Sequence, residues 1–201
     1  MTARLAVLAS GNGSNLQAVL DACVAERLDA SIVGVVTNNA GAGCVARAER
    51  AGIPTVVLER RAGEERRPYD ARLVAAVAPL APDWIVLAGW MRILTSAFLD
   101  EHPGRVVNLH PALPGELAGT HAIERAYDEF RAGLRTATGV MVHLVPDEGV
   151  DDGPVLAHEA VEIRPDDTLA DLETRVHAIE HELLVTTLVR VIALTPTPLE
   201  R

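Results

Sequence analysis

The sequence predicts an α/β fold in which a doubly wound, mostly parallel, Rossmann-like sheet ends in an antiparallel C-terminal edge. Through residue 109, short apolar runs alternate with segments of helical periodicity, which indicates strands joined by crossover helices. Further along, segments 138–145 and 155–163 resemble strands with no helix between them, which favours antiparallel pairing. The length of 201 residues and the hydrophobic content of 49% suit one domain, which we expect at residues 1–194.

Strand and helix patterns alternate regularly in the first half of the chain. The β-branched run at 31–37 is typical of a buried strand, whereas apolar side chains recur at helical spacing from Leu16 to Val24. Gly52 and Pro54 end a helix pattern. We expect strands at 4–10, 31–37, 55–58, 84–88 and 105–109, and helices at 15–27, 44–51, 69–77 and 96–101.

The second half has a different character. A loop rich in proline and glycine at 111–119 precedes an expected helix at 121–131, and an acidic turn at 146–154 joins the two expected strands. A long helix is expected over 169–194, followed by a frayed tail at 195–201. The arginine-rich segment 59–68 has no apolar period, so we interpret it as a solvated loop.

The charged side chains exclude several functions. The chain has 28 acidic residues and 18 basic ones, all arginine, so its formal net charge is −10. Without lysine it cannot carry a Walker-type phosphate loop or form a Schiff base, and without a basic face it is not expected to bind nucleic acid. No segment suits a signal peptide or a membrane span, and Cys23 and Cys44 form no paired motif. We therefore expect a cytoplasmic protein with small-molecule partners.

A glycine-rich loop follows the first expected strand. It reads Ser-Gly-Asn-Gly-Ser-Asn over 10–15 and leads into a helix for which Ser14 would be the cap. Glycines and a helix N-terminus can bind a phosphate through backbone N–H groups without any lysine. Leu16 stands where a dinucleotide motif would need its third glycine, which weakens a dinucleotide interpretation. A phosphate site and a plain tight turn both remain open on this pattern.

A second polar cluster follows the strand at 105–109. Asn108 and His110 are two residues apart, so their side chains share one face where parallel strands end and ligands bind. An amide and an imidazole side by side suit a developing oxyanion and a proton transfer. Residue types alone also allow a turn-forming asparagine beside a surface histidine.

The acidic turn and the remaining histidines carry weaker signals. The turn holds Asp151 among four acids whose spacing does not fit a calcium loop, and a carboxylate there could keep a nearby histidine protonated. It could equally be a polar turn in which aspartate and glycine take left-handed conformations. His177 and His181 are four residues apart, which is a weak zinc signal without further ligands, so we expect no metal.

Taken together and in order, these segments resemble the phosphoribosylglycinamide formyltransferase family, the folate-dependent enzymes of purine synthesis. The resemblance runs from about residue 4 to residue 189, nearly the whole chain. It rests on Ser-Gly-Asn-Gly-Ser-Asn-Leu-Gln at 10–17, Ala-Gly-Trp-Met-Arg-Ile-Leu at 88–94, Asn-Leu-His-Pro at 108–111 and Val-Asp-Asp-Gly-Pro at 150–154. The first segment is specific to this family, and the last two are shared with other folate formyltransferases.

The resemblance implies three groups of site residues and a co-substrate, 10-formyltetrahydrofolate. The catalytic residues would be Asn108, His110 and Asp151. The ribonucleotide would bind to Gly13, Ser14, Asn15, Arg66 and Glu180. The folate would bind to Met91, Arg92, Ile93, Leu94 and Val145, with His121 and His143 in support. The resemblance leaves open whether the protein is a monomer or a homodimer.

The implied mechanism moves a formyl group to an amine without a metal. Asn108 would donate a hydrogen bond to the developing oxyanion, and Asp151 would keep His110 protonated as a second donor while helping to move the proton. The loop at 111–119 departs from the family pattern. Leu117 and Ala118 replace an aromatic residue and a proline, and Ile123 stands where a second histidine is frequent.

Other functions fit parts of the same pattern. Formyltetrahydrofolate deformylase is a hydrolase with a similar catalytic group, but its relatives carry a preceding regulatory domain, and the first strand here begins near residue 4. Methionyl-tRNA formyltransferase would need a C-terminal extension that grips RNA. A non-catalytic nucleotide-binding module would need only the glycine-rich loop, and all three catalytic residues are present here.

Overall fold

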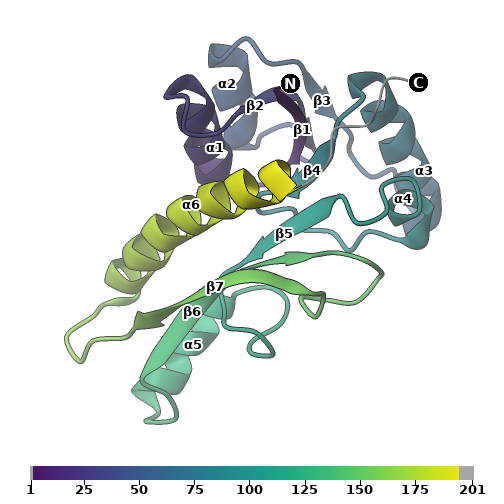
Figure 1. Cartoon of the computed structure of the whole chain (residues 1–201). Helices are drawn as coiled ribbons and strands as arrows, with labels where there is room; N and C mark the ends of the chain where they lie inside the picture. Colours follow the sequence, from purple (N-terminus) through teal and green to yellow (C-terminus); the bar gives the residue numbers. More distant parts are fainter. Residues whose placement is uncertain (1, 195–201) are drawn as a thin grey trace.

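A computed structural model, which describes residues 2–194, contains a seven-stranded sheet with the order β3-β2-β1-β4-β5-β6-β7 (Figure 1). The strands are β1 Ala3–Leu8, β2 Ala30–Thr37, β3 Thr55–Val57, β4 Trp84–Leu87, β5 Val106–His110, β6 Ala137–Leu144 and β7 Val155–Glu162. The helices are α1 Ser14–Val24, α2 Gly43–Arg50, α3 Arg66–Val77, η1 Ala78–Leu80, α4 Ser96–Leu99, α5 Ala122–Arg131 and α6 Leu169–Leu194.

The pairing of the strands confirms the predicted fold class. Strands β3, β2, β1, β4 and β5 pair in parallel, whereas β6 runs antiparallel to both β5 and β7. From β1 the chain builds the sheet outward to β2 and β3, then returns to place β4 on the other side of β1. This reversal is the topological switch point, beside which open α/β sheets bind their ligands.

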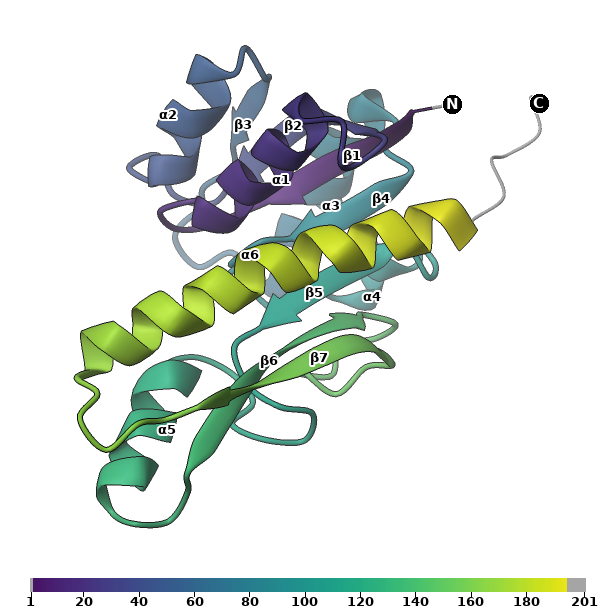
Figure 2. The ribbon, with the colours of Figure 1, turned by 60° about the vertical axis from the view of Figure 1, so that its left-hand side comes forward.

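Two hydrophobic cores cover the two faces of the sheet, as a parallel sheet requires. Alternation along β1 sends Leu5 and Val7 into one core and Ala6 and Leu8 into the other. Helices α1, α2, α5 and α6 contribute to the first core, and α3 and α4 to the second. Figure 2 shows α6 running across the sheet beside α1.

One polar residue interrupts the buried stripe of α6. Leu172, Val176, Leu184 and Leu188 are buried at four-residue intervals, and Glu180 occupies the middle position of the same series. Positions four residues apart share one helix face, so the fold that buries this stripe must also bury the carboxylate. Packing of α6 therefore carries a charged group towards α1 and the switch point.

Several boundaries differ from the expected ones. Helix α3 begins at Arg66, so the end of the segment 59–68 is helical, and its beginning is tied down because Glu64 accepts hydrogen bonds from Arg61 and Arg72. The prediction of a loop is therefore wrong at 66–68, whereas its solvated character is confirmed for every residue of 59–68 except the buried Glu64. The expected tail at 195–201 lies outside the described residues. No described helix combines the length and the apolar character needed to cross a membrane.

Candidate active site

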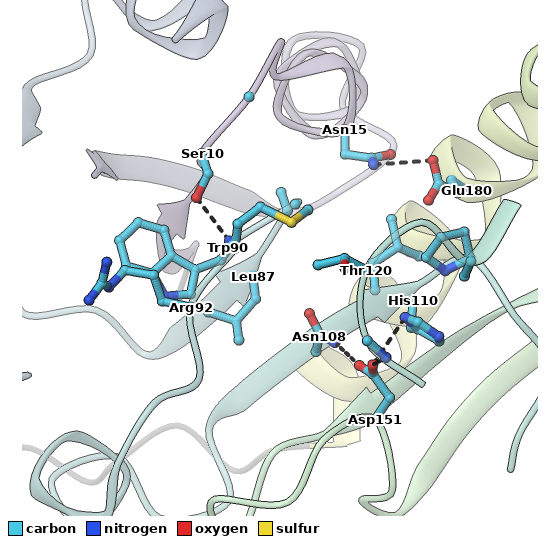
Figure 3. A pocket seen from close by; sticks show the side chains of 18 of the residues that line it. Ser10, Asn15, Leu87, Trp90, Arg92, Asn108, His110, Thr120, Asp151 and Glu180 are labelled. Atoms are coloured by element: carbon cyan, nitrogen blue, oxygen red, sulfur yellow. Dashed lines mark hydrogen bonds and ion pairs between the residues drawn. The ribbon is translucent and has the colours of Figure 1, made fainter. Parts of the chain in front are cut away.

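A cavity of about 770 Å³ lies at the switch point. Its walls come from the loops that follow β1, β4 and β5, from the turn between β6 and β7, and from one face of α6 (Figure 3). Every predicted site residue except Arg66 lines this cavity. The parallel strands deliver their carboxyl ends to the same edge, and the packing of α6 brings Glu180 to Asn15, so that residues more than 160 positions apart in the sequence meet at one site.

The glycine-rich loop forms one wall and leaves the start of α1 uncapped. Gly13 has a φ of 80° and stands at the N-cap position, where no side chain caps the helix. The expected cap at Ser14 is wrong, because Ser14 is already the first helical residue. The first helical bond runs from the Gln17 N–H to the Gly13 carbonyl, so the N–H groups of the first turn precede it and can face a ligand.

Asn15 and Glu180 form a buried polar pair beside this loop (Figure 3). The Asn15 Nδ2 donates to Glu180 Oε2 at 3.5 Å, while the Asn15 Oδ1 is buried without a hydrogen-bond partner. Burial raises the pKa of Glu180, and the neighbouring His177 and Asn15 oppose this shift only in part. A buried carboxylate and an unsatisfied amide oxygen have the chemistry to bind hydroxyl groups of a ligand.

Asn108, His143 and Asp151 form a hydrogen-bonded cluster on neighbouring strands and the acidic turn. Asn108 on β5 is paired in register with His143 on β6. The Asn108 Nδ2 lies 3.0 Å from both Asp151 Oδ1 and His143 Nε2. His143 Nδ1 lies 2.8 Å from the Leu144 carbonyl, so a ring protonated at Nδ1 accepts at Nε2. In this structure both Asn108 amide hydrogens therefore face the protein.

His110 is held between the acidic turn and the loop that follows β5. Its Nδ1 lies 3.3 Å from Asp151 Oδ2, and its Nε2 lies 3.1 Å from the Leu117 carbonyl. Burial lowers the pKa of His110, because Asp151 and the Leu117 carbonyl raise it by less than burial lowers it. The expectation of a histidine kept protonated by Asp151 is therefore wrong for the free protein. The carboxylate is where the sequence suggested, but desolvation of the ring outweighs its charge.

Asp151 is ionised and locally strained. Burial alone would raise its pKa, but its neighbours His143, Gly119 and His110 together lower the pKa below its usual value. The Gly119 N–H donates to Asp151 Oδ2 at 2.8 Å. Asp151 also has a φ of 55°, a left-handed conformation that aspartate tolerates better than most residues. This agrees with the interpretation of the acidic segment as a turn that uses left-handed positions.

The segment after β4 supplies an apolar wall. Met91 and Ile93 are 63% and 43% exposed, while Leu94 is buried. The Met91 N–H donates to the Ser10 hydroxyl at 2.9 Å, which ties this segment to the glycine-rich loop. The Arg92 guanidinium lies 4.2 Å from the centre of the Tyr69 ring. Together with Val145, these residues form a surface that a flat, partly apolar ligand would cover.

Two predicted residues lie at the edge of the site or outside it. Arg66 does not line the cavity, and its guanidinium lies 3.1 Å from Glu148 of the acidic turn. Glu148 also accepts from the Ser96 N–H, so it links the acidic turn to α3 and α4. His121 lines the cavity, but its Nδ1 lies 3.0 Å from Glu124 at the start of its own helix.

Sequence reasoning missed residues that complete the cavity. Thr120 and His177 both line it, and Arg125 donates to the Leu117 and Ala118 carbonyls from behind the loop. The helical spacing of His177 and Glu180 was the signal in the sequence that could have identified His177. Nothing in the local pattern marked Arg125, because its role depends on where the loop lies. Among residues 2–194, no three His, Cys, Asp or Glu side chains are grouped to hold a metal ion.

The site combines an uncapped helix N-terminus with an amide, an imidazole and a carboxylate at a switch point. These are the features of an α/β enzyme active site that accepts a small, partly anionic substrate. The sequence profile of the family described as formyl transferase matches residues 3–188. The chain therefore belongs to the formyl transferase family, which confirms the resemblance found in the sequence.

Individual relatives support the same assignment. Phosphoribosylglycinamide formyltransferase of Schizosaccharomyces pombe is 41% identical over 197 residues, covering 92% of this chain and 95% of the relative. The Escherichia coli enzyme of the same name is 39% identical over 183 residues, covering 89% and 82%. The crystal structure of glycinamide ribonucleotide transformylase 1 from Geobacillus kaustophilus is similar with a TM-score of 0.88 at 38% identity, covering 95% of this chain and 99% of that one.

Proposed function

We propose that this chain transfers the formyl group of 10-formyltetrahydrofolate to the glycine amine of 5′-phosphoribosylglycinamide, a step of purine biosynthesis. The observation that carries the proposal is one cavity that joins the uncapped start of α1 to the cluster of Asn108, His110 and Asp151. The first feature suits a phosphate and the second suits a formyl transfer. The names of the relatives from S. pombe and E. coli support the same reaction.

The ribonucleotide binds on the α1 side of the cavity. Backbone N–H groups at Gly13, Ser14 and Asn15 bind the phosphate, which needs no lysine because a helix N-terminus attracts an anion. The buried Glu180 carboxylate accepts hydrogen bonds from the ribose hydroxyls. Arg66 adds positive charge on this side when it exchanges Glu148 for the phosphate.

The folate binds against the segment that follows β4. Met91, Ile93, Leu94 and Val145 offer an apolar wall, and backbone groups of the acidic turn offer donors and acceptors to the pterin ring. His121 and His143 support the site from its rim and its floor. A cavity of about 770 Å³ lies within the range that holds a drug-sized ligand.

Asn108 stabilises the charge that develops on the formyl oxygen. As the amine adds to the formyl carbon, this oxygen becomes an oxyanion. Asn108 donates a hydrogen bond to it and gives up one of its present acceptors, Asp151 or His143. Removal of such a donor costs on the order of 100–1000-fold in turnover.

The pair formed by His110 and Asp151 moves the proton. Because burial lowers the pKa of His110, the ring is neutral near pH 7 and can accept the proton that the amine loses. Asp151 stabilises the resulting imidazolium across the 3.3 Å contact. The same proton then passes from the imidazolium to the departing N10 atom, which restores the neutral ring, while Asp151 stays ionised throughout.

A formyl-transfer assay tests the proposal against its alternatives. The purified chain is incubated with 10-formyltetrahydrofolate, with and without the ribonucleotide. We expect formylated ribonucleotide and deformylated folate in equal amounts, and only when the ribonucleotide is present. Release of formate without it would indicate the hydrolase, and no turnover with either mixture would indicate a nucleotide-binding module.

A further inference from the structure

A second cavity lies behind the glycine-rich loop. It measures about 420 Å³ and is lined by side chains of α1, α2 and α6, among them Arg47 on α2. Ser14 lines both cavities, whereas Arg47 does not line the active site. Arg47 therefore stands on the far side of the loop from the proposed substrate, and whatever it does for the substrate must act through the loop.

All three nitrogens of the Arg47 guanidinium donate hydrogen bonds to this loop or to the helix that follows it. Its Nε donates to the Asn12 carbonyl at 2.9 Å, its Nη2 donates to Asn12 Oδ1 at 2.8 Å, and its Nη1 donates to Gln17 Oε1 at 3.2 Å. The first two bonds hold both the backbone and the side chain of Asn12. The third reaches the first turn of α1, so one rigid planar group spans the loop and the helix that follows it.

The charge of Arg47 has no direct counter-ion. Among the described residues, none of the ion pairs involves Arg47, and all its acceptors are neutral amide oxygens. Within residues 2–194, four other arginines form ion pairs with a glutamate or aspartate, namely Arg66, Arg72, Arg135 and Arg175. A positive charge directly behind the proposed phosphate loop, with Asp21 and Glu182 lining the same cavity but not bonded to it, adds to the field of the α1 N-terminus.

The start of α2 fits closely against the same loop. The Cys44 N–H donates to the Gly11 carbonyl at 3.2 Å. A Cβ atom at Gly13 would lie 2.8 Å from the Cys44 backbone, and one at Gly43 would lie 2.9 Å from the Asn12 carbonyl. The loop conformation thus depends on α2, and Arg47 is the residue of α2 that bonds to the loop through its side chain.

We propose that Arg47 is a positioning residue for the substrate phosphate. It fixes Asn12 and Gln17 so that the N–H groups between them converge on the phosphate, and its charge favours that anion without touching it. The inference rests on the proposed function, because it assigns to Arg47 the recognition of the 5′-phosphate in that reaction. It predicts that loss of Arg47 weakens binding of the phosphorylated substrate and leaves the folate and the chemical step unchanged.

The main test compares Arg47→Gln with Arg50→Gln. Arg50 lies on the same helix, is exposed, and makes none of the side-chain hydrogen bonds found among the described residues, so its loss removes the same charge without loosening the loop. We expect Arg47→Gln to raise the KM for the ribonucleotide by on the order of ten- to hundredfold, the usual effect of losing charge-assisted hydrogen bonds. The KM for the folate and the kcat should stay within about twofold of the parent chain.

A second measurement separates positioning from general loss of structure. The same kinetics are run with glycinamide riboside, which lacks the phosphate. Arg47→Gln should reduce the preference for the phosphorylated substrate, whereas a merely damaged fold would weaken both substrates alike. Arg47→Lys keeps the charge but loses the planar fork, so it should recover only part of the preference.

The outcomes of the two proposals are distinguishable. If the parent chain shows no ribonucleotide-dependent transfer, the proposed function fails. If the parent chain is active but Arg47→Gln retains the parent KM and phosphate preference, the role of Arg47 is overturned. Combining Arg47→Gln with Asn12→Ala gives a third check, because both changes remove the bond between Arg47 Nη2 and Asn12 Oδ1 and their effects on KM should therefore not be fully additive.

Discussion

The two sides of the cavity obtain left-handed backbone in different ways. On the side of β1 and β4, the positive φ angles belong to Gly13 and Gly89. On the side of the acidic turn and the loop after β5, Gly115 and Gly119 are joined by three non-glycine residues, Leu117, His121 and Asp151, whose φ angles are 45°, 58° and 55°. The first side thus takes these angles at low cost, whereas each of these three non-glycine residues of the second side costs on the order of 1–3 kcal/mol.

The difference follows from what each side contributes. The glycine-rich loop is proposed to bind a phosphate through its backbone, so it needs no side chain at Gly13, and the contact with Cys44 excludes one. The acidic turn must present the Asp151 carboxylate to His110 and Asn108, so glycine cannot replace it. A loop that binds its ligand through backbone N–H groups can use glycine and remain unstrained. A turn that must present a side chain keeps backbone strain, which its hydrogen bonds must offset.

The largest effect is expected at the strained side. Asp151→Asn keeps the size of the side chain but removes its charge, so His110 loses the group that stabilises its protonated form. We expect kcat to fall by on the order of 100–10,000-fold with both substrates still binding. Steady-state kinetics and binding measured by calorimetry test this, and a kcat near that of the parent chain would remove Asp151 from the mechanism.

The second largest effect is expected at the glycine-rich loop, where the positive φ angle belongs to a glycine. Gly13→Ala forces a Cβ atom to within 2.8 Å of the Cys44 backbone at a φ of 80°. We expect the KM for the ribonucleotide to rise about tenfold and unfolding to become easier by about 1–3 kcal/mol. Gly63→Ala is the control, because Gly63 has a φ of 71° and open space around its Cβ position. Equal effects on the two substrates would mean that the loop is only structural.

Substitution of Glu180 is expected to have a smaller effect, which raises stability but weakens binding of the ribonucleotide. Because burial raises the pKa of this carboxyl group, Glu180 keeps its proton to higher pH in the folded state than in the unfolded chain, so its own contribution to stability falls as pH rises from the unfolded value of 4.5 through the folded value. Glu180→Gln should remove this slope and raise the Tm at pH 7 by about 2–4 °C, the shift that 1 kcal/mol produces in a chain of this size. It should also raise the KM for the ribonucleotide. A Tm at pH 7 equal to that of the parent chain would contradict the claim that the buried Glu180 carboxylate lowers stability.

The smallest effect is expected at Arg125, behind the strained loop. Arg125→Gln frees the Leu117 and Ala118 carbonyls and removes a charge that lowers the pKa of His110. We expect a few-fold loss of kcat and a shift of the acidic limb of kcat/KM to higher pH, since His110 must be neutral to accept the proton. Arg131→Gln, which changes the same helix elsewhere, should leave the pH profile in place.

The fold was predictable because periodicity and alternation are local signals. The parallel pairing among β1 to β5 and the antiparallel pairing of β6 with β7 follow from whether a helix separates consecutive strands, whereas β6 is antiparallel to β5 although α5 lies between them, which this rule does not predict. Most of the site was predictable because the glycine-rich loop and the Asn108 and His110 pair stand at strand ends. Glu180 could also be found as the one charged residue in an apolar stripe of α6.

The rest depends on distances that a sequence does not contain. The expected protonation of His110 was wrong, because the pattern reveals the neighbouring Asp151 but not how completely the ring is buried. The location of Arg66 outside the cavity depends on its pairing with Glu148, which is 82 residues away. Arg125 acts on carbonyl groups of a loop whose position in space the sequence does not reveal, so no local pattern could indicate it.

The close fit of α2 against Gly13 makes the loop observable without any substrate. Cys44 is completely buried there, with its thiol directed at the Ala9 carbonyl, so a thiol reagent can reach it only when α2 separates from the loop. The rate of its alkylation would therefore measure how often this part of the protein opens. Cys23 is only partly buried, and it provides an internal reference for the reagent within the same molecule.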